Sequence, residues 1–303
     1  MKNTGTIKVN KLKTQFEKWS KKSIGEKITL SLFFLYFLFH AVLALYPFLW
    51  VFNNSLKTLE EYSLSPMKMV SSWQFVNYIK VFDQFVVNGI VGYWELLWNS
   101  IWQTFVYLIA NLFSSMFVAY ALAKFRFPGR NFLYGVIIFA QTIPIVGTGG
   151  AAFKFRYDIG MYDNPWFFWV SWAVGFDYSA FLIYGTLKSV SNSYAESAEI
   201  DGANEWQILW KIIFPQIFPL MLALMVNNFV ARWGDFGTSQ VNFPSYPNLA
   251  YGMYLFQLGS SWAKDGRVIY YASIIISAIP GVVLYALFQN TIIQNMSVGG
   301  LKG

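Results

Sequence analysis

The sequence contains no cysteine and a single histidine, His40. Without cysteine, disulfides, thiolate metal sites and cysteine nucleophiles are excluded. One histidine is too few for a zinc site built on several imidazoles, and we expect His40, which lies in an apolar run, to be a packed helix residue. The sequence also lacks a Gly-x-x-x-x-Gly-Lys-Ser/Thr phosphate loop and a Gly-x-Ser-x-Gly nucleophile elbow. We therefore expect no catalysis by this chain, no bound cofactor and no metal.

Charged side chains are also scarce: they make up 12% of the 303 residues, about half the share in typical soluble domains. Hydrophobic residues make up 56% and aromatic residues 20%. So few charges could not cover so much apolar surface in water, and disordered chains are poor in aromatics. The composition therefore predicts an integral membrane protein.

Six apolar runs are long enough to cross about 30 Å of hydrocarbon as helices. They lie near residues 28–52, 96–122, 132–150, 165–187, 216–234 and 268–290. The first run is longer than the apolar part of a signal peptide, and we interpret it as a retained helix. The sequence thus predicts an all-α integral membrane protein, a six-transmembrane-helix bundle occupying residues 28–290.

The distribution of basic residues predicts the orientation. Of the 22 lysines and arginines, eight fall in residues 1–27, a basic N-terminal segment. Placing both termini in the cytoplasm (N-in/C-in) puts 14 basic residues inside, although the outside segments are longer. Basic residues are retained on the cytoplasmic side of membranes. The net charge of +7 therefore indicates topology and contact with lipid headgroups, and we expect no nucleic-acid partner.

Residues 188–219 break the apolar pattern. Capping-box spacing of Ser193 with Glu196 and of Asn204 with Gln207, on either side of Gly202, predicts two short helices over 194–201 and 205–213. We expect a sharp turn at 202–204, and prolines 215 and 219 at the entry to the fifth span. Such a cytoplasmic hairpin could pack on its own bundle, lie in the headgroup layer or dock a soluble partner.

This segment resembles the EAA loop of ABC-importer permeases. The family pattern is Glu-Ala-Ala, three residues, Gly, nine residues and Ile-x-Leu-Pro. The chain has Glu196, Ser197 and Ala198, then Gly202, and then an Ile-x-Phe-Pro ending at residue 215. The triplet Asp201, Gly202 and Ala203 is also typical of the family. This chain departs from the family pattern at two positions: Ser197 replaces the second-position Ala, and Phe214 replaces Leu.

Three further segments are similar to sugar-import permeases. They are the basic loop 124–130 after the second span, the Trp-Gly-Asp-Phe element at 233–236 after the fifth, and the tail Gly-Gly-Leu-Lys-Gly at 299–303, which is similar to that of the maltose-type second permease subunit. Gly234 replaces an Asn of the family element.

The resemblance implies a type I ABC importer permease of a bacterial cytoplasmic membrane. Its expected partners are a second permease subunit, two ABC ATPases that bind ATP and Mg, and an extracellular solute-binding protein that delivers a carbohydrate, an oligosaccharide in particular. The hairpin would be the coupling helix held by an ATPase. The residues implied for coupling are Glu196, Ser197, Ala198, Asp201, Gly202 and Ala203. The tail 291–303 would contact the ATPases through Gly300, Leu301, Lys302 and Gly303.

Four polar residues are candidates for the substrate path: Asp177, Tyr178, Asn227 and Asn228. Acids and amides inside spans usually face the bundle interior or a watery path, and hydrogen bonds between helices explain them equally well. Glu196 could likewise only cap its own helix. Alternative cargoes are glycerol phosphate, an amino acid or a peptide. An ion channel or a membrane enzyme would be a different class.

Overall fold

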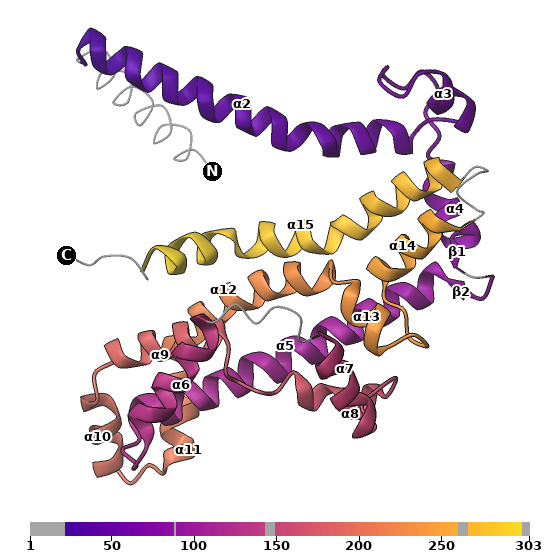
Figure 1. Ribbon diagram of the computed structural model, residues 1–303. Helices are drawn as coiled ribbons and strands as arrows, with labels where there is room; N and C mark the ends of the chain where they lie inside the picture. The colour runs from indigo at the N-terminus through magenta and orange to yellow at the C-terminus, as the bar shows by residue number, and fades with distance from the viewer. Residues whose placement is uncertain (1–21, 88, 143–148, 260–265, 299–303) are drawn as a thin grey trace.

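The computed structural model describes residues 22–87, 89–142, 149–259 and 266–298. Within these residues the regular secondary structure is helical apart from one short antiparallel pair, β1 (Val86–Val87) with β2 (Val91–Gly92), in which Val86 faces Gly92 and Val87 faces Val91. The observed fold therefore agrees with the predicted all-α class. Figure 1 shows the long helices running side by side, with the hairpin 193–213 at one end of the bundle.

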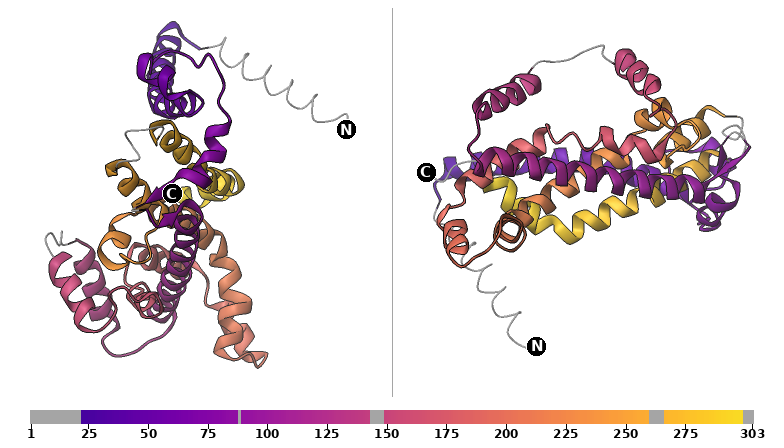
Figure 2. Two further views of the ribbon diagram at one scale, coloured as in Figure 1. Left: turned by 90° about the vertical axis from the view of Figure 1, so that its right-hand side faces the viewer. Right: turned by 90° about the horizontal axis from the view of Figure 1, so that it is seen from below.

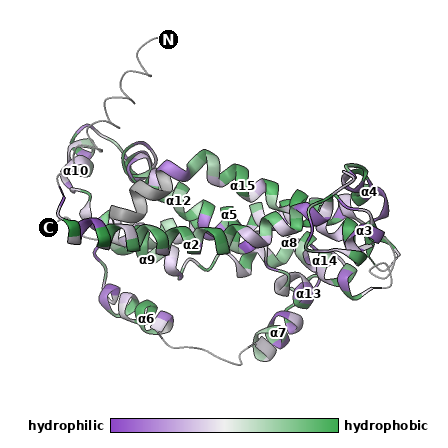
Figure 3. Cartoon of the chain, turned by 90° about the horizontal axis from the view of Figure 1, so that it is seen from above, coloured by the Kyte–Doolittle hydropathy of each residue, from purple (hydrophilic) through white to green (hydrophobic). Residues whose placement is uncertain are grey.

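Four helices are long and apolar enough to cross a membrane. They are α2 (Ile24–Ser55), α5 (Tyr93–Lys124), the continuous helix Glu205–Trp233 and the first part of α15 (Gly266–Val298). The helix Glu205–Trp233 comprises α11 (Glu205–Ile208), the π-helical turn η2 (Leu209–Ile213) and α12 (Phe214–Trp233). These four correspond to the first, second, fifth and sixth predicted spans. Figure 3 shows that hydrophobic residues predominate along these helices.

The third predicted span, 132–150, contains the C-terminal part of α6 (Arg130–Thr142) and the start of α7 (Gly149–Asp158). Residues 143–148 lie outside the described residues. Figure 2 shows α6 and α7 standing apart from the bundle of long helices. A single continuous third helix is thus neither confirmed nor contradicted by the structure.

The fourth predicted span, 165–187, is not one helix. It consists of α8 (Pro165–Phe168), the 3-10 turn η1 (Trp169–Ser171), an irregular segment and α9 (Tyr178–Ser189). Gly175 interrupts the helix with φ +69°, and Asp177 caps α9, accepting a hydrogen bond from the backbone N–H of Ala180 at 3.1 Å. The prediction that Asp177 lies well inside a membrane helix was therefore wrong, because its short carboxylate competes for backbone donors and starts a helix.

Helix α5 lies at the centre of the bundle and contacts α9, α12 and α14 (Leu249–Leu258). Its C-terminal part packs Met116 and Ala119, both fully buried, against Ile183 of α9 and Ile217 of α12. Ala119 is one of the small residues that the sequence spaces four apart, and such rows allow close approach of helices. The hydrophobic effect and tight packing thus fix α5 and its neighbours to one another.

Helix α2 contacts α15 but leaves most of its apolar side chains exposed. In Figure 1 it lies along one side of the bundle. A long exposed apolar helix is expected where lipid or another membrane protein replaces water. At its end, α3 (Leu59–Leu64) and α4 (Val76–Gln84) form a small cap, and α13 (Gly237–Asn242) and α14 lie near the same end of the bundle.

The cap is organised by Lys57, which is fully buried. Its Nζ donates to the backbone carbonyls of Ser65, Pro66 and Lys68 at 2.9, 3.3 and 2.7 Å. Burial lowers the pKa of this ammonium from its ordinary value, because the charged form is partly desolvated. Three carbonyl partners offset part of that desolvation and order the loop around one side chain.

Candidate functional site

The predicted hairpin is present. Helix α10 (Ser193–Ile200) is followed by a turn and then by α11. Gly202 has φ +82°, its N–H donates to the carbonyl of Glu199 at 3.0 Å, and the N–H of Ala203 donates to that of Ala198 at 2.9 Å. This pair of bonds is the Schellman arrangement that ends helices at glycine. The turn therefore has the position and the conformation that the sequence predicts.

The second arm begins with the predicted capping box. The side chain of Asn204 accepts from the N–H of Gln207, and the side chain of Gln207 accepts from the N–H of Asn204, each at 2.9 Å. These two bonds satisfy donors that a helix start leaves without partners. The direction in which the chain leaves the Gly202 turn is thus fixed locally.

The capping box predicted for the first arm is absent. Asn192 precedes α10, and Ser193 is already its first residue. The Ser193 hydroxyl pairs with that of Ser191 at 2.8 Å, so it does not cap the helix. Glu196 is exposed, and within the described residues its carboxylate has no hydrogen-bonding partner. The structure therefore leaves this acid available to another molecule.

The second arm continues into α12 without a break, whereas the sequence predicts a helix ending at 213 and a separate span. The π-helical turn η2 ends at Ile213, two residues before Pro215. In a regular α-helix the proline ring would crowd the carbonyl four residues earlier, and a wider turn relieves such crowding. The prediction of two separate elements was wrong, and the arm and the membrane helix form one continuous unit.

One side of the second arm is buried and the other is exposed. Ile208, Leu209 and Ile213 belong to the hydrophobic core shared with α5 and α9. Trp206 is 64% exposed and its ring lies 6.3 Å from that of Phe117. In the first arm Ile200 is 87% exposed, beside the exposed Asp201 and Gly202. The tip of the hairpin thus presents apolar and acidic groups together.

The C-terminal end of α5 is hydrogen-bonded to both sides of the hairpin. The Tyr120 hydroxyl donates to Oε2 of Glu205, the first residue of the second arm, at 3.1 Å. Lys124 Nζ donates to the carbonyl of Val190 at 3.1 Å and to Oδ1 of Asn192 at 2.9 Å, just before the first arm. These contacts join segments more than 60 residues apart in the sequence.

Asp177 lies at a junction of helices. Its carboxylate accepts from Nδ2 of Asn111 at 2.9 Å and from the hydroxyl of Ser115 at 2.8 Å, both on α5, as well as from the N–H of Ala180. Charged acceptors make stronger hydrogen bonds than neutral ones. The carboxylate therefore links the start of α9 to the middle of α5.

Asn228 of α12 extends this network. Its Nδ2 donates to the hydroxyl of Ser179 at 3.2 Å and to Oδ1 of Asn111 at 3.5 Å. We call Asn111, Ser115, Asp177, Ser179 and Asn228 the polar junction. Of the four predicted path residues, the structure brings together Asp177 and Asn228. Tyr178 is 60% exposed and Asn227 is also exposed, outside this network.

Sequence reasoning missed Asn111, Ser115 and Ser179 as parts of this junction. All three are buried polar residues on helices, at positions where an apolar residue would otherwise be expected. The sequence shows that they are polar but not that they face one another. Their contact depends on how α5, α9 and α12 cross.

The predicted Trp-Gly-Asp-Phe element forms a joint at the other end of α12. Asp235 pairs with Arg232 at 2.6 Å and accepts from the N–H of Thr238 at 3.1 Å. The Arg232 guanidinium contacts the rings of both Tyr107 and Trp172, at 4.8 and 4.6 Å from their centroids. Such cation–π contacts are strongest when desolvated. Sequence reasoning did not identify Arg232.

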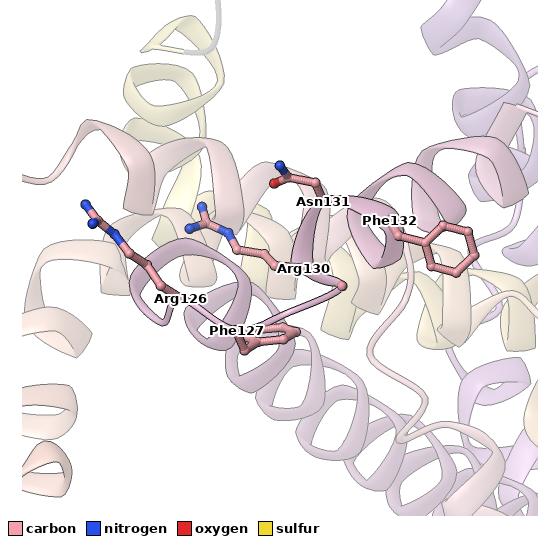
Figure 4. A pocket seen from close by; sticks show the side chains of 6 residues that line it. Arg126, Phe127, Arg130, Asn131 and Phe132 are labelled. Atoms are coloured by element: carbon pink, nitrogen blue, oxygen red, sulfur yellow. The ribbon is translucent and has the colours of Figure 1, made fainter.

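The basic loop after α5 borders a shallow hollow of about 290 Å³. Figure 4 shows Arg126, Arg130 and Asn131 beside it, with Phe127 and Phe132. Arg130 Nη1 also donates to the carbonyl of Phe125 at 3.4 Å, which closes the loop. The predicted tail residues 300–303 lie outside the described residues. Within the described part of the chain, no three His, Cys, Asp or Glu side chains are grouped as metal ligands would be.

Solved structures share this fold. A bacterial ABC transporter involved in the import of the acidic polysaccharide alginate aligns with TM-score 0.74 and 24% identity, over 89% of this chain and 98% of the other. A bacterial alginate ABC transporter in complex with an alginate pentasaccharide-bound periplasmic protein aligns with TM-score 0.58 and 16% identity, over 88% and 96% of the two chains. At these identities the likeness concerns the fold alone.

Several characterised proteins are similar along most of their length. The Streptomyces coelicolor diacetylchitobiose uptake permease NgcG is 26% identical, over 86% of this chain and 85% of the relative. The Bacillus subtilis galactooligosaccharide permease GanQ is 25% identical, over 89% and 94%. The Thermococcus litoralis trehalose/maltose permease MalG is 25% identical, over 87% and 93%.

The family comparison covers the part of the chain that holds the hairpin and the polar junction. The model of the "Binding-protein-dependent transport system inner membrane component" family matches residues 111–298, more than half of the sequence. The chain therefore belongs to this family of ABC transporter permeases.

Proposed function

We propose that this chain forms half of the translocation path of an ATP-driven importer and that its cargo is a carbohydrate, an oligosaccharide in particular. Relatives named for diacetylchitobiose, galactooligosaccharides and trehalose/maltose support this class of cargo. The observation that carries the proposal is the exposed hairpin, which is continuous with membrane helix α12 and lies inside the family match. A soluble partner bound there would act on the membrane helices directly.

The partners follow from this role. Two ABC ATPases would bind ATP and Mg, and one of them would hold this chain's hairpin through Glu196, Ser197, Ala198, Asp201, Gly202 and Ala203. A second permease subunit would complete the path, and an extracellular solute-binding protein would deliver the cargo. The chain itself would be non-catalytic and bind no cofactor. The alginate transporter complex with a periplasmic protein supports the expectation of a binding protein.

The mechanism is a rigid-body movement. When the ATPases close on ATP, the hairpin moves with the groove that holds it, and α12 moves with the hairpin because η2 joins them without a break. Exposed Glu196 and Ile200 supply charged and apolar contacts for that groove. The tail residues Gly300 to Gly303 would add a second contact with the ATPases.

The four predicted path residues have different surroundings. Asp177 and Asn228 hold neighbouring helices through the polar junction. Tyr178 and Asn227 are exposed, and an exposed phenol and amide can exchange water for sugar hydroxyls. We therefore assign cargo contact first to Tyr178 and Asn227, and shaping of the path wall to Asp177 and Asn228.

Reconstitution tests this proposal. The complex purified through a tag on this chain, with its ATPases and binding protein, is placed in liposomes with labelled maltooligosaccharide, galactooligosaccharide or chitooligosaccharide. We expect ATP-dependent uptake of at least one of them. Uptake of glycerol phosphate, amino acids or peptides alone would replace the cargo assignment, and ATP-independent conductance would indicate a channel.

A further inference from the structure

The C-terminal end of α5 carries two polar side chains that lie outside the EAA-like pattern and that the function described above does not use. Tyr120 and Lys124 are four residues apart, so they lie on one face of the helix. Tyr120 bonds the second arm of the hairpin through Glu205, and Lys124 bonds the entry to the first arm at Val190 and Asn192. One helix face therefore contacts the hairpin at two places, where the chain enters the first arm and where the second arm begins after the Gly202 turn.

The Tyr120–Glu205 hydrogen bond depends on how α5 packs against the hairpin. Tyr120 is only 7% exposed, whereas Glu205 is exposed, so the phenol reaches from the packed helix interface to the hairpin surface. Its hydroxyl has a carboxylate acceptor, which makes a stronger bond than a neutral one. Removing the hydroxyl leaves the aromatic packing in place but separates Glu205 from α5.

Lys124 acts through neutral acceptors. Its Nζ bonds a backbone carbonyl and an amide oxygen, and it forms no ion pair within the described residues. A surface ion pair would be loosened by salt, but these bonds depend on the positions of two particular oxygens. The ammonium therefore fixes where the chain enters α10.

The same helix carries two of the five residues of the polar junction. Ser115 and Asn111 bond Asp177 at the start of α9, roughly 14–20 Å along α5 from Lys124 at ~1.5 Å per residue. Between these two sets of contacts, Met116 and Ala119 are fully buried. A packed helix transmits displacement along its axis because close-packed interiors have low compressibility. This segment of α5 is thus bonded to the hairpin at one end and to the start of α9 at the other.

We propose that Tyr120 and Lys124 are positioning residues that set the angle of the hairpin on α5, and that α5 carries hairpin movement to the polar junction at Asp177. This inference rests on the proposed function and deepens it: α12 is one continuous connection from the hairpin into the membrane, and α5 is a second one. Loss of the two contacts would leave a hairpin that binds its ATPase but drives only one of the two helices.

The test uses Tyr120→Phe, Lys124→Met and the double variant in the reconstituted complex. We expect uptake per ATP hydrolysed to fall about fivefold or more in the double variant, the lower end of typical coupling between sites. ATPase binding to the chain should remain. Tyr184→Phe and Lys188→Met, which remove the same groups from α9 at the same end of the bundle, are matched controls that should retain the wild-type ratio.

Variants of Glu205 separate positioning from simple packing. Glu205→Gln keeps an acceptor for the Tyr120 hydroxyl and should retain coupling, whereas Glu205→Leu should lose it. Tyr120→Phe and Glu205→Leu should be non-additive, because each breaks the same bond. Additive losses, or an unchanged ratio in the double variant, would overturn the inference.

A distance measurement tests the inference without transport. Because the chain has no cysteine, spin labels can be attached at two exposed positions outside these contacts, Glu199→Cys in α10 and Ile109→Cys in α5. In the nucleotide-free complex we expect a narrow distance distribution for the otherwise wild-type chain and a broader one for the double variant. Equal distributions would refute the positioning role, even if the complex imports sugar. If the wild-type complex fails to import sugar but the distance distribution of the double variant is still broader, the proposed function is refuted and the positioning role is not.

Discussion

Gly175 stands where only a hydrogen atom fits. Its φ is +69°, and a Cβ there would lie 2.7 Å from the carbonyl oxygen of Ser114 and 2.9 Å from Cγ2 of Val118, both on α5. A side chain would therefore meet backbone strain and a clash together. This glycine allows the irregular segment before α9 to pass close to α5.

Gly175→Ala should lower the free energy of unfolding by about 2–4 kcal/mol, since it adds left-handed strain to overpacking. Gly185→Ala is the matched control, because Gly185 lies in helix α9 and nothing lies within 4 Å of a Cβ there. Thermal unfolding of the detergent-purified chain measures both variants. Equal transition temperatures would show that the segment can move away from α5.

Gly202 presents the opposite situation. Its φ is +82°, yet nothing lies within 4 Å of a Cβ. The requirement is therefore one of backbone conformation alone, which asparagine tolerates and β-branched residues do not.

Gly202→Val should cost about 1–2 kcal/mol of turn stability and lower sugar uptake per ATP, whereas Gly202→Asn should retain most of it. Both proteins should insert and purify normally. Uptake by reconstituted complexes and pull-down of the ATPase check the outcome. If valine and asparagine act alike, the groove of the ATPase rather than the backbone turn requires the small residue.

Alanine substitutions at Asp177 and at its neighbour Tyr178 should affect different properties, stability in the first case and cargo binding in the second. Asp177→Ala leaves Asn111 and Ser115 without their acceptor, so we expect a loss of about 2–4 kcal/mol in stability. Tyr178→Ala changes an exposed side chain and should leave stability within about 0.5 kcal/mol while raising the KM for the cargo. Unfolding and uptake kinetics of both variants measure this separation. An unchanged melting temperature for Asp177→Ala would remove its structural role.

At the scale of elements, the cap after α2 should respond to acid. The backbone N–H of Ser71 donates to Glu61 at 2.6 Å, and this bond lowers the pKa of the carboxyl below its ordinary value. A lowered folded-state pKa means that the bond stabilises the cap above the ordinary glutamate pKa, and that this contribution is lost as pH falls through the folded pKa.

Glu61→Gln should abolish that part of the pH dependence. Hydrogen exchange of the peptide around residues 59–73, compared between wild type and variant at each pH, measures it. The two proteins should differ at neutral pH and converge in acid. A constant difference throughout would mean that the Ser71 bond does not depend on the carboxylate charge.

Local rules explain which elements could be predicted from the sequence. The Gly202 turn and the Asn204–Gln207 capping box depend on residues within five positions of one another, so their pattern is sufficient. The continuity of the second arm with α12 could not be predicted, since Pro215 normally interrupts a helix and a π-helical turn accommodates it here.

At the scale of the whole molecule, the chain is an inner membrane component whose first, second, fifth and sixth predicted spans are long apolar helices. The predicted N-in/C-in orientation places the hairpin in the cytoplasm. The cap at Glu61 should then lie outside, because it is at the opposite end of α2.

Single-cysteine labelling tests this orientation, since the absence of native cysteine removes background. In cells whose envelope outside the cytoplasmic membrane has been permeabilised, a membrane-impermeant maleimide should label Glu60→Cys and leave Glu199→Cys unlabelled. In inverted membrane vesicles it should label Glu199→Cys and leave Glu60→Cys unlabelled. Both positions are on helices, and Glu199 lies in α10. Labelling of Glu199→Cys from outside would contradict the coupling role of the hairpin.

The membrane environment, the all-α class and the hairpin turn could be predicted from the amino acids alone, because composition, apolar run length and capping are local properties of the chain. By contrast, the packing of the helices was needed to show that Asp177 bonds α5, that Arg232 contacts two aromatic rings and that Tyr120 and Lys124 bond the hairpin. These contacts join residues about 60 to 125 positions apart in the chain. Their geometry depends on how packed helices cross, and no spacing along the chain encodes that crossing.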